Sequence, residues 1–190
     1  ISGVYLNLAR SFEGTPEKQR EYAQKALAIL AASDPKSLDY NDYYLLSDVA
    51  DALENLGLAE QDPALQRELY YIAASMALRV LESRPCDQWR WNFWGVCLNR
   101  LAQVAPQEDR AAVFQLCKDI FLRLDAMAPG SESYNVACLE ALTGNPDAAR
   151  LWLERAKAFK TLPVRAHILS DPDMIPIRNQ PWFNSILPEE

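Results

Sequence analysis

The sequence offers few arrangements of residues that could carry out catalysis or hold a metal. His167 is the only histidine, so Ser-His, Cys-His and zinc arrangements lack most of their parts. The pairs Asp48/Asp51 and Asp171/Asp173 offer oxygen ligands to a cation, but helix capping or a polar surface explains each pair. The sequence also has no glycine-rich phosphate-binding loop. We therefore predict no enzyme, no cofactor and no metal site.

The cysteines and the hydropathy pattern indicate where the chain resides. Cys86, Cys97, Cys117 and Cys138 include no CxxC pair, which argues against metal or redox chemistry. They lie in helical patterns, so we interpret them as small buried apolar residues in a reducing compartment. No apolar stretch approaches the roughly 20 residues that span a bilayer, and we expect no export signal because residue 1 is not followed by a basic region and then an apolar one. The expected location is the cytoplasm, without membrane contact.

An aromatic cluster occupies residues 86–95, which read CDQWRWNFWG. At about 100° per residue, its apolar side chains cover an arc too wide for a surface helix. Trp91 and Trp94 are therefore predicted to lie in the core, where large aromatic side chains anchor interiors. Trp89 falls at the edge of the arc, where it could contact a ligand or pack on the surface.

The composition indicates that the scaffold holding the aromatic cluster is helical. The chain has 190 residues, of which 49% are apolar and 24% are charged, as in an ordinary globular domain. Runs of Ala, Leu, Glu, Arg and Gln, which are strong helix formers, predict an all-α fold. The formal charge is -7, and without a basic stripe we expect no nucleic-acid partner.

One spacing recurs four times and predicts a set of helices that we call A helices. Each copy consists of the residues at positions i, i+3, i+4 and i+7, and the residue at i+4 is small. These offsets share one helical face, and the small residue lets a neighbouring helix approach closely. The four copies are Tyr5, Leu8, Ala9, Phe12; Tyr43, Leu46, Ser47, Ala50; Trp91, Trp94, Gly95, Leu98; and Ser133, Val136, Ala137, Glu140.

A second spacing follows each A helix and predicts a B helix. It consists of a small or apolar residue, a bulky or apolar residue four positions later, and another three positions after that. In three copies a proline five positions further on ends the pattern, since proline cannot continue a helix. Breakers or polar linkers separate A from B at 14–16, 57–63, 106–109 and 144–146, and Thr15 and Asn145 are expected to cap the next helix. The B-helix copies are Ala23, Leu27, Leu30, Pro35; Ala73, Ala77, Val80, Pro85; Cys117, Phe121, Leu124, Pro129; and Ala149, Leu153, Ala156.

These patterns resemble the tetratricopeptide repeat, whose signature is W-x2-L-G-x2-Y…A-x3-F…P. In YNVACLEAL and TGNPDAARLWLERA, residues Gly144, Ala149, Leu153 and Ala156 stand where the family has its Gly, Ala, aromatic and Ala. The resemblance implies a right-handed α-solenoid of about four helix pairs. It covers residues 1–160, with pairs at about 1–35, 40–85, 88–129 and 131–160, and the first two periods are longer than the family's roughly 34 residues.

The proline-rich residues 161–190 are expected to form a C-terminal cap. The run SDPDMIPIRNQPWF is similar to a closing segment that follows the final repeat in bacterial tetratricopeptide proteins. Ser170 or Asp171 is expected to cap a short helix that begins with Pro172. The apolar side chains that would cover the last helix pair are Trp182, Phe183, Ile186 and Leu187.

In the tetratricopeptide family, the A helices line a concave groove that receives peptides or partner helices, and the resemblance implies the same surface here. We expect a protein–protein interaction module, with the groove at the positions three before and one after the small residue of each A helix. Solvated helix faces remain the alternative explanation of these positions. The residues predicted to bind a protein or peptide partner are Arg10, Tyr44, Asp48, Asp51, Trp89, Asn92, Val96, Asn99, Arg100 and Tyr134.

Two further expectations concern the partner. Asp48, Asp51 and the negative net charge favour a partner of basic character, by charge complementarity. The start at Ile1 rather than Met suggests a piece of a longer protein. The alternative function is therefore a regulatory or sensor domain of a larger enzyme, such as a kinase, that docks on its own catalytic domain.

Overall fold

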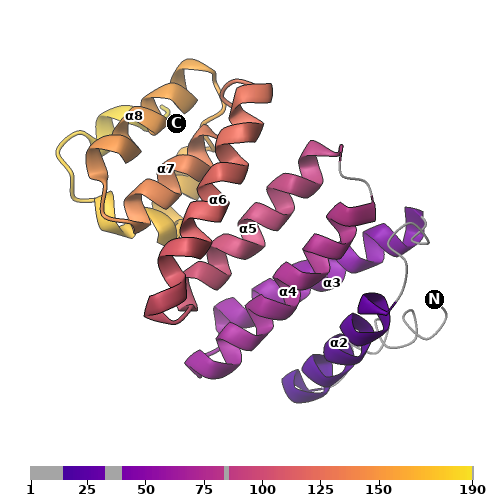
Figure 1. The fold of residues 1–190 in the computed structure, drawn as a ribbon. Coiled ribbons are helices and arrows are strands. Elements are labelled where there is room, and N and C mark those ends of the chain that lie inside the picture. The colour runs from indigo at the N-terminus through magenta and orange to yellow at the C-terminus, as the bar shows by residue number, and fades with distance from the viewer. Residues whose placement is uncertain (1–14, 33–39, 84–85, 190) are drawn as a thin grey trace. The chain divides into compact units, whose positions relative to one another are not determined.

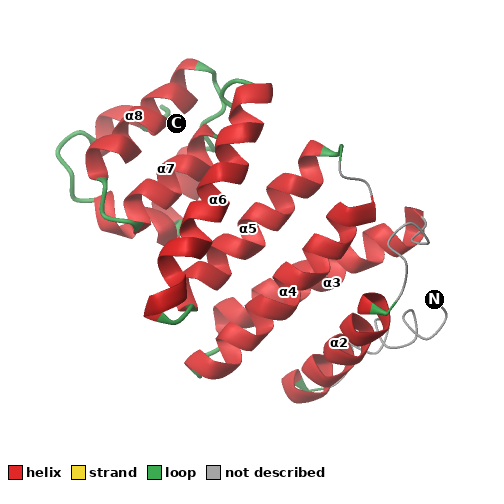
Figure 2. Cartoon of the chain, viewed as in Figure 1, coloured by secondary structure: helices red, strands yellow, loops and turns green. Residues whose placement is uncertain are grey.

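The structure is a computed structural model, and it describes residues 15–32, 40–83 and 86–189. The regular elements of these residues are helices, and no strand occurs among them (Figure 2). The all-α class predicted from the composition is confirmed. The chain forms two compact units, Ile1–Val113 and Phe114–Glu190.

The first unit is built from long antiparallel helices. Each of them contains one A-helix or B-helix spacing of the sequence. Helix α4 packs against both α3 and α5, and α2 also contacts α4 (Figure 1). Because α4 has neighbours on both sides, apolar residues are needed around most of its circumference. The bounds of these helices are Pro16–Ala31 for α2, Tyr40–Ala59 for α3, Pro63–Ser83 for α4 and Gln88–Val104 for α5.

The second unit consists of longer helices and a C-terminal segment of short helices. Helix α6 begins in the first unit, because the boundary between the units falls inside it. It ends two residues before Pro129, as the proline predicts. The elements are α6 (Gln107–Met127), α7 (Ser133–Leu142), α8 (Pro146–Ala158), α9 (Arg165–Ser170), the 3-10 helix η2 (Pro172–Ile177) and α10 (Phe183–Ile186).

The small residues of the repeated spacing lie in the helix interfaces. Gly95 is buried, and small side chains at such places let helix axes approach closely. The first A helix, with Ala9, lies outside the described residues, and so does the side chain of Ser47. The small residues of the A-helix and B-helix patterns that have 0% exposure are Ala23, Ala50, Ala73, Ala77, Cys117, Ala137, Ala149 and Ala156.

Gly57 is a point where the observed helix differs from the expected linker. Residues 57–63 were predicted to separate two helices, but α3 continues to Ala59. A Cβ atom at Gly57 would lie 2.5 Å from the ring of Tyr70 in α4. The glycine therefore serves close packing between α3 and α4 rather than a turn.

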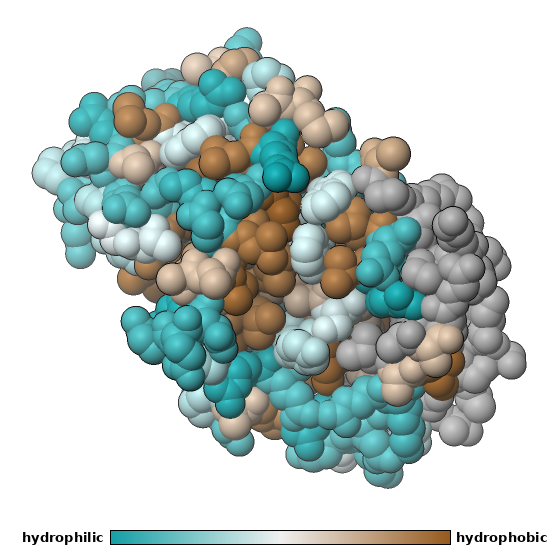
Figure 3. Space-filling model, in the orientation of Figure 1, coloured by the Kyte–Doolittle hydropathy of each residue, from teal (hydrophilic) through white to brown (hydrophobic). Residues whose placement is uncertain are grey.

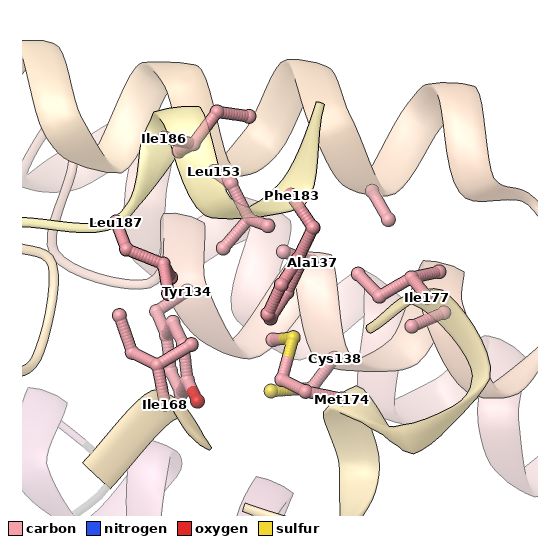
Figure 4. Packing of buried hydrophobic residues seen from close by; sticks show 12 residues of the cluster. Tyr134, Ala137, Cys138, Leu153, Ile168, Met174, Ile177, Phe183, Ile186 and Leu187 are labelled. Carbon is pink, nitrogen blue, oxygen red and sulfur yellow. The ribbon is translucent and has the colours of Figure 1, made fainter. Parts of the chain in front are cut away.

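The C-terminal segment and the last two helices share one apolar core. Side chains of α7 and α8 meet those of α9, η2 and α10, and they point toward one another in Figure 4. Phe183, Ile186 and Leu187 are buried in this cluster, and Trp182 packs against it. The residues expected to cover the last helix pair do so, and they belong to the same compact unit as that pair.

Asp125 fixes the turn between α6 and α7 by hydrogen bonds. Its Oδ1 accepts from the backbone N–H of Gly130 at 3.0 Å and from the hydroxyl of Ser133 at 2.8 Å. Its Oδ2 accepts from Nη2 of Arg155 at 2.8 Å. Gly130 has φ of 91°, which a residue with a side chain rarely adopts. One buried carboxylate thus joins α6, the turn and α8.

The predicted caps have different outcomes. Asp171 caps η2 by accepting from the N–H of Asp173 at 2.9 Å. The Thr15 hydroxyl hydrogen-bonds the side chain of Glu17 and lowers the pKa of that carboxyl, so a backbone cap at Thr15 stays a prediction. Asn145 is the N-cap residue of α8, as predicted, but its side chain makes no capping hydrogen bond. Its amide instead donates to the Glu140 carboxylate at 3.1 Å, because that carboxylate lies at the end of α7 beside the turn.

The cysteines follow the prediction except at one position. Cys97, Cys117 and Cys138 are buried, whereas Cys86 is exposed. The prediction for Cys86 is wrong because this residue precedes α5, in the turn before Asp87, and so has no helical face to bury. Within the part of the chain that the structure describes, none of the helices combines the length and the hydrophobicity that crossing a membrane requires.

Candidate functional site

The candidate site lies on α5, and the start of this helix is set by Asp87. Its side chain accepts a hydrogen bond from the backbone N–H of Trp89 at 3.1 Å, which satisfies one of the unpaired donors of the first turn. The same carboxylate lies 3.2 Å from the guanidinium of the buried Arg90. These contacts hold the first turn in place, and with it Trp89.

Trp89 presents a large aromatic surface to solvent. Its side chain is 52% exposed, whereas Phe93, one turn later, is 7% exposed. The two rings are stacked, with centroids 5.5 Å apart and planes 10° apart. Phe93 therefore supports Trp89 from below, and an aromatic side chain held in this way loses little conformational entropy when a partner binds.

Asn92 and Val96 continue the exposed side of α5 from Trp89. Both are half-buried, and they stand three before and one after Gly95, at the groove positions predicted for this A helix. We call Trp89, Asn92 and Val96 the α5 face. It offers an aromatic ring, an amide and an aliphatic side chain, a combination typical of polypeptide recognition.

Arg100 has a structural contact of its own. Its Nε lies 3.0 Å from Oε1 of Glu54 in α3, and both side chains are less than one-fifth exposed. The pair therefore joins α5 to α3. We expect Arg100 to hold the two helices together at the edge of the α5 face rather than to lead recognition.

Two predicted binding residues, Asn99 and Tyr134, are buried instead. Asn99 is 7% exposed and Tyr134 is 9% exposed, so neither presents a surface to a partner. Asn99 lies seven positions after Asn92, on the same side of α5, but two turns further along the helix, where it is buried. Tyr134 is covered because residues of the C-terminal segment pack over it.

The remaining predicted binding residues cannot be placed by side chain. Arg10 lies outside the described residues. The backbone of α3 is described at Tyr44, Asp48 and Asp51, but their side chains lie outside the described part. Their contribution to a groove stays a prediction.

Trp91 and Trp94 differ in part from the prediction. Their rings meet edge to face, with centroids 5.8 Å apart, but both residues are half-buried rather than fully enclosed. A tryptophan side chain is so large that packing on one helix side seldom covers it completely. Of the three tryptophans of α5, Trp89 is the one most exposed.

The corresponding positions of α7 are Tyr134 and Cys138, three before and one after Ala137, and we call this pair the α7 face. The hydroxyl of Tyr134 donates to Oδ2 of Asp171 at 2.8 Å, and Sγ of Cys138 lies 3.9 Å from the same oxygen. Burial and the nearby acidic groups raise the pKa of the Tyr134 hydroxyl well above its ordinary value. It therefore remains a hydrogen-bond donor throughout the working range of pH.

The described residues contain little that could support chemistry. No group of three or more His, Cys, Asp or Glu residues that could hold a metal occurs among them. His167 is exposed, and its Nε2 lies 3.9 Å from Oδ2 of Asp171. Burial raises the pKa of the Cys117 thiol to about 12, so that it is not a nucleophile at neutral pH.

A pocket lies in the first unit, away from the predicted binding residues. Its volume is about 610 Å³, and Tyr71, the aromatic residue of its lining, is 59% exposed. Figure 3 shows hydrophobic residues over α5, bordered by hydrophilic ones. None of the predicted binding residues lines the pocket. Its lining residues are Ala64, Arg67, Glu68, Tyr71, Leu101, Ala105, Pro106, Asp109, Ala112 and Val113.

Sequence reasoning missed two features of these surfaces. Phe93 supports Trp89, and the spacing of four positions between two aromatic residues is a signal that could have revealed the stack. Tyr71 stands four positions after Arg67 and seven after Ala64, so all three share a face of α4. Comparison with models of protein families, with curated proteins and with solved structures finds no match for this chain.

Proposed function

We propose that this chain is a tetratricopeptide-like α-solenoid that binds a polypeptide segment of another protein on its A helices, with the α5 face as the centre of the site. The proposal rests mainly on Trp89, whose side chain is 52% exposed and stacked on the buried Phe93. Exposed aromatic residues on a rigid base commonly dominate binding energy at protein interfaces.

The buried small residues also support the solenoid. Gly95 and Ala137, which occupy the same place in two A helices, are both buried. Ala73 and Ala149 hold the same place in two B helices, and both have 0% exposure. A repeated close contact between successive helices is the basis of helical-repeat architectures.

The binding mechanism would be recognition without turnover. The Trp89 ring would cover an apolar side chain of the partner, the Asn92 amide would pair with a polar group or the backbone, and Val96 would extend the apolar contact. The side chains of α3 that complete the predicted groove, Asp48 and Asp51, would favour basic residues in the flanking parts of the partner.

The test compares two exposed aromatic residues of the first unit. Wild type, Trp89→Ala and Tyr71→Ala are immobilised, and the proteins that each retains from a cell extract are quantified by mass spectrometry. Tyr71 is the matched control because it is also an exposed aromatic residue, in the pocket rather than on the α5 face. We expect partners that Trp89→Ala loses by at least about tenfold and that Tyr71→Ala keeps.

Loss with Tyr71→Ala alone would move the site to the pocket and contradict the proposal, as would equal retention by all three proteins. Circular dichroism verifies that both variants keep their helices. The large exposed fraction of each side chain makes unfolding of either variant unexpected.

A further inference from the structure

The second unit shows what a segment bound to an A-helix face looks like. Residues 168–177, which we call the covering segment, lie on the α7 face in the same chain. Ile168 and Met174 have 0% exposure and Ile177 has 1%, and all three join the core cluster of Tyr134 and Cys138 (Figure 4). Aliphatic side chains on both sides of a turn thus provide the apolar part of the contact.

Asp171 provides the polar part of the contact from the middle of the covering segment. Its Oδ2 accepts from the Tyr134 hydroxyl, and its Oδ1 accepts from the N–H of Asp173 at 2.9 Å. Its backbone oxygen accepts from Nη2 of Arg178 at 2.6 Å, and Pro172 restricts the backbone next to it. A bond within the segment and one from the adjoining Arg178 therefore hold the aspartate toward the helix.

The α5 face carries related chemistry at the same positions. Relative to the buried small residue, Asn92 takes the place of Tyr134, and both side chains have a hydrogen-bond donor. Val96 takes the place of Cys138, so an aliphatic group replaces a thiol that behaves as a small apolar residue. Unlike the α7 face, the α5 face includes a half-exposed aromatic ring, that of Trp89, which can cover one more apolar side chain.

We infer that the α5 face binds a partner segment of the same chemistry as the covering segment, an Asp-Pro turn flanked by aliphatic residues. The turn carboxylate accepts from Asn92, and the aliphatic residues contact Val96 and the Trp89 ring. This inference rests on the proposed function and names the partner class. The turn is restricted before binding, which lowers the entropy lost in the complex.

The covering segment carries Asp171 and Asp173, and an arginine stands on either side of it. Across residues 164–178, Arg165 and Arg178 balance the two aspartates when His167 is neutral. A partner segment with such basic flanks brings one carboxylate to Asn92 without adding net repulsion, and the flanks complement the negative charge of the protein.

The probe is the chain's own segment, a fluorescein-labelled peptide VRAHILSDPDMIPIR that is titrated into the intact protein and followed by anisotropy. We expect saturable binding that Trp89→Ala and Val96→Asp each weaken by at least about tenfold, and that Tyr71→Ala leaves within about twofold. A peptide with Asp171→Ala should lose a similar factor. Asn92→Ala is the milder second variant, in case Val96→Asp disturbs the fold.

Binding at the α7 face is the competing outcome, and Tyr134→Phe detects it. If this substitution strengthens peptide binding while Trp89→Ala has no effect, the peptide replaces the covering segment on α7 and the inference is overturned. Absence of saturable binding to wild type also overturns it. In that case, Trp89-dependent capture of a partner from an extract would leave the proposed function standing, whereas loss of both results would remove both.

Discussion

The A-helix faces of α5 and α7 have the same spacing and opposite surroundings. On α5, Trp89 is 52% exposed, and Asn92 and Val96 are half-buried. On α7, Tyr134 and Cys138 are 9% and 3% exposed, because the C-terminal segment packs over them. The comparison teaches that the repeated spacing defines a face of a helix, and that a distant segment decides whether the face is available.

The two faces also differ in what they contribute to stability. A fully buried aliphatic or aromatic side chain contributes roughly 1.5 to 3 kcal/mol by leaving water. The α7 face is covered by several such side chains, among them Ile168, Met174 and Phe183. The α5 face lacks comparable burial at Trp89, so its aromatic surface remains exposed to solvent.

The largest expected effect that separates the two regions is that of Phe183→Ala. Phe183 is 1% exposed in the core over α7 and α8, and its loss leaves a cavity, so we expect about 3 to 5 kcal/mol less free energy of unfolding. Trp89→Ala should cost under about 1 kcal/mol, since half of its side chain is already in water. Chemical denaturation measures both, and equal losses would contradict the assignment of the faces.

Asp125→Asn should have the next largest effect, within the second unit. The substitution removes the charge that pairs with Arg155 and one acceptor of the turn, and we expect a loss of about 2 to 3 kcal/mol at neutral pH. The estimate is below that for a fully buried pair because the Arg155 side chain is 38% exposed. Unchanged stability would show that the turn does not depend on this carboxylate.

The same carboxylate predicts a dependence of stability on pH. Burial alone would raise the pKa of Asp125, but the hydrogen bonds from Ser133 and Arg155, with the charge of Arg155, outweigh it and lower the pKa. The stabilisation is therefore complete above the unfolded pKa of about 3.9 and is lost as the pH falls through the lower folded value. Denaturation between neutral and acidic pH should give Asp125→Asn a shallower loss of stability than wild type.

The smallest expected difference in stability is between substitutions at matched positions on the two faces. Tyr134→Phe removes the donor to Asp171, and we expect a loss of about 1 to 2 kcal/mol because a buried acceptor loses a partner. Asn92→Ala on the α5 face should cost less, under about 1 kcal/mol, since its surroundings are partly solvated. Thermal unfolding of the two variants measures the difference, and a larger loss with Asn92→Ala would mean that the α5 face is structural.

Local signals predicted several elements well. Pro129 marks the end of α6, and Gly144 lies in the turn between α7 and α8. Asp171 caps the helix that begins at Pro172. These predictions succeeded because proline, glycine and aspartate act on the backbone within a few residues, without help from tertiary contacts.

Predictions that depend on distant neighbours were less accurate. Tyr134 stands at a groove position but is enclosed by residues more than thirty positions later in the chain, such as Asp171, to which it donates. Side-chain spacing carries no information on which segment folds back onto a given helix.

The sequence by itself determined that the chain is helical, where most helices begin and end, and which small residues face their neighbours. These properties follow from local propensity and from the period of the α-helix. Only the tertiary structure decided that the α7 face is closed, that Trp89 rests on Phe93 in the open, and that Asp125 joins three parts of the second unit. The exposure of a face and the pairing of a buried charge depend on segments far apart in the sequence, which only folding brings together.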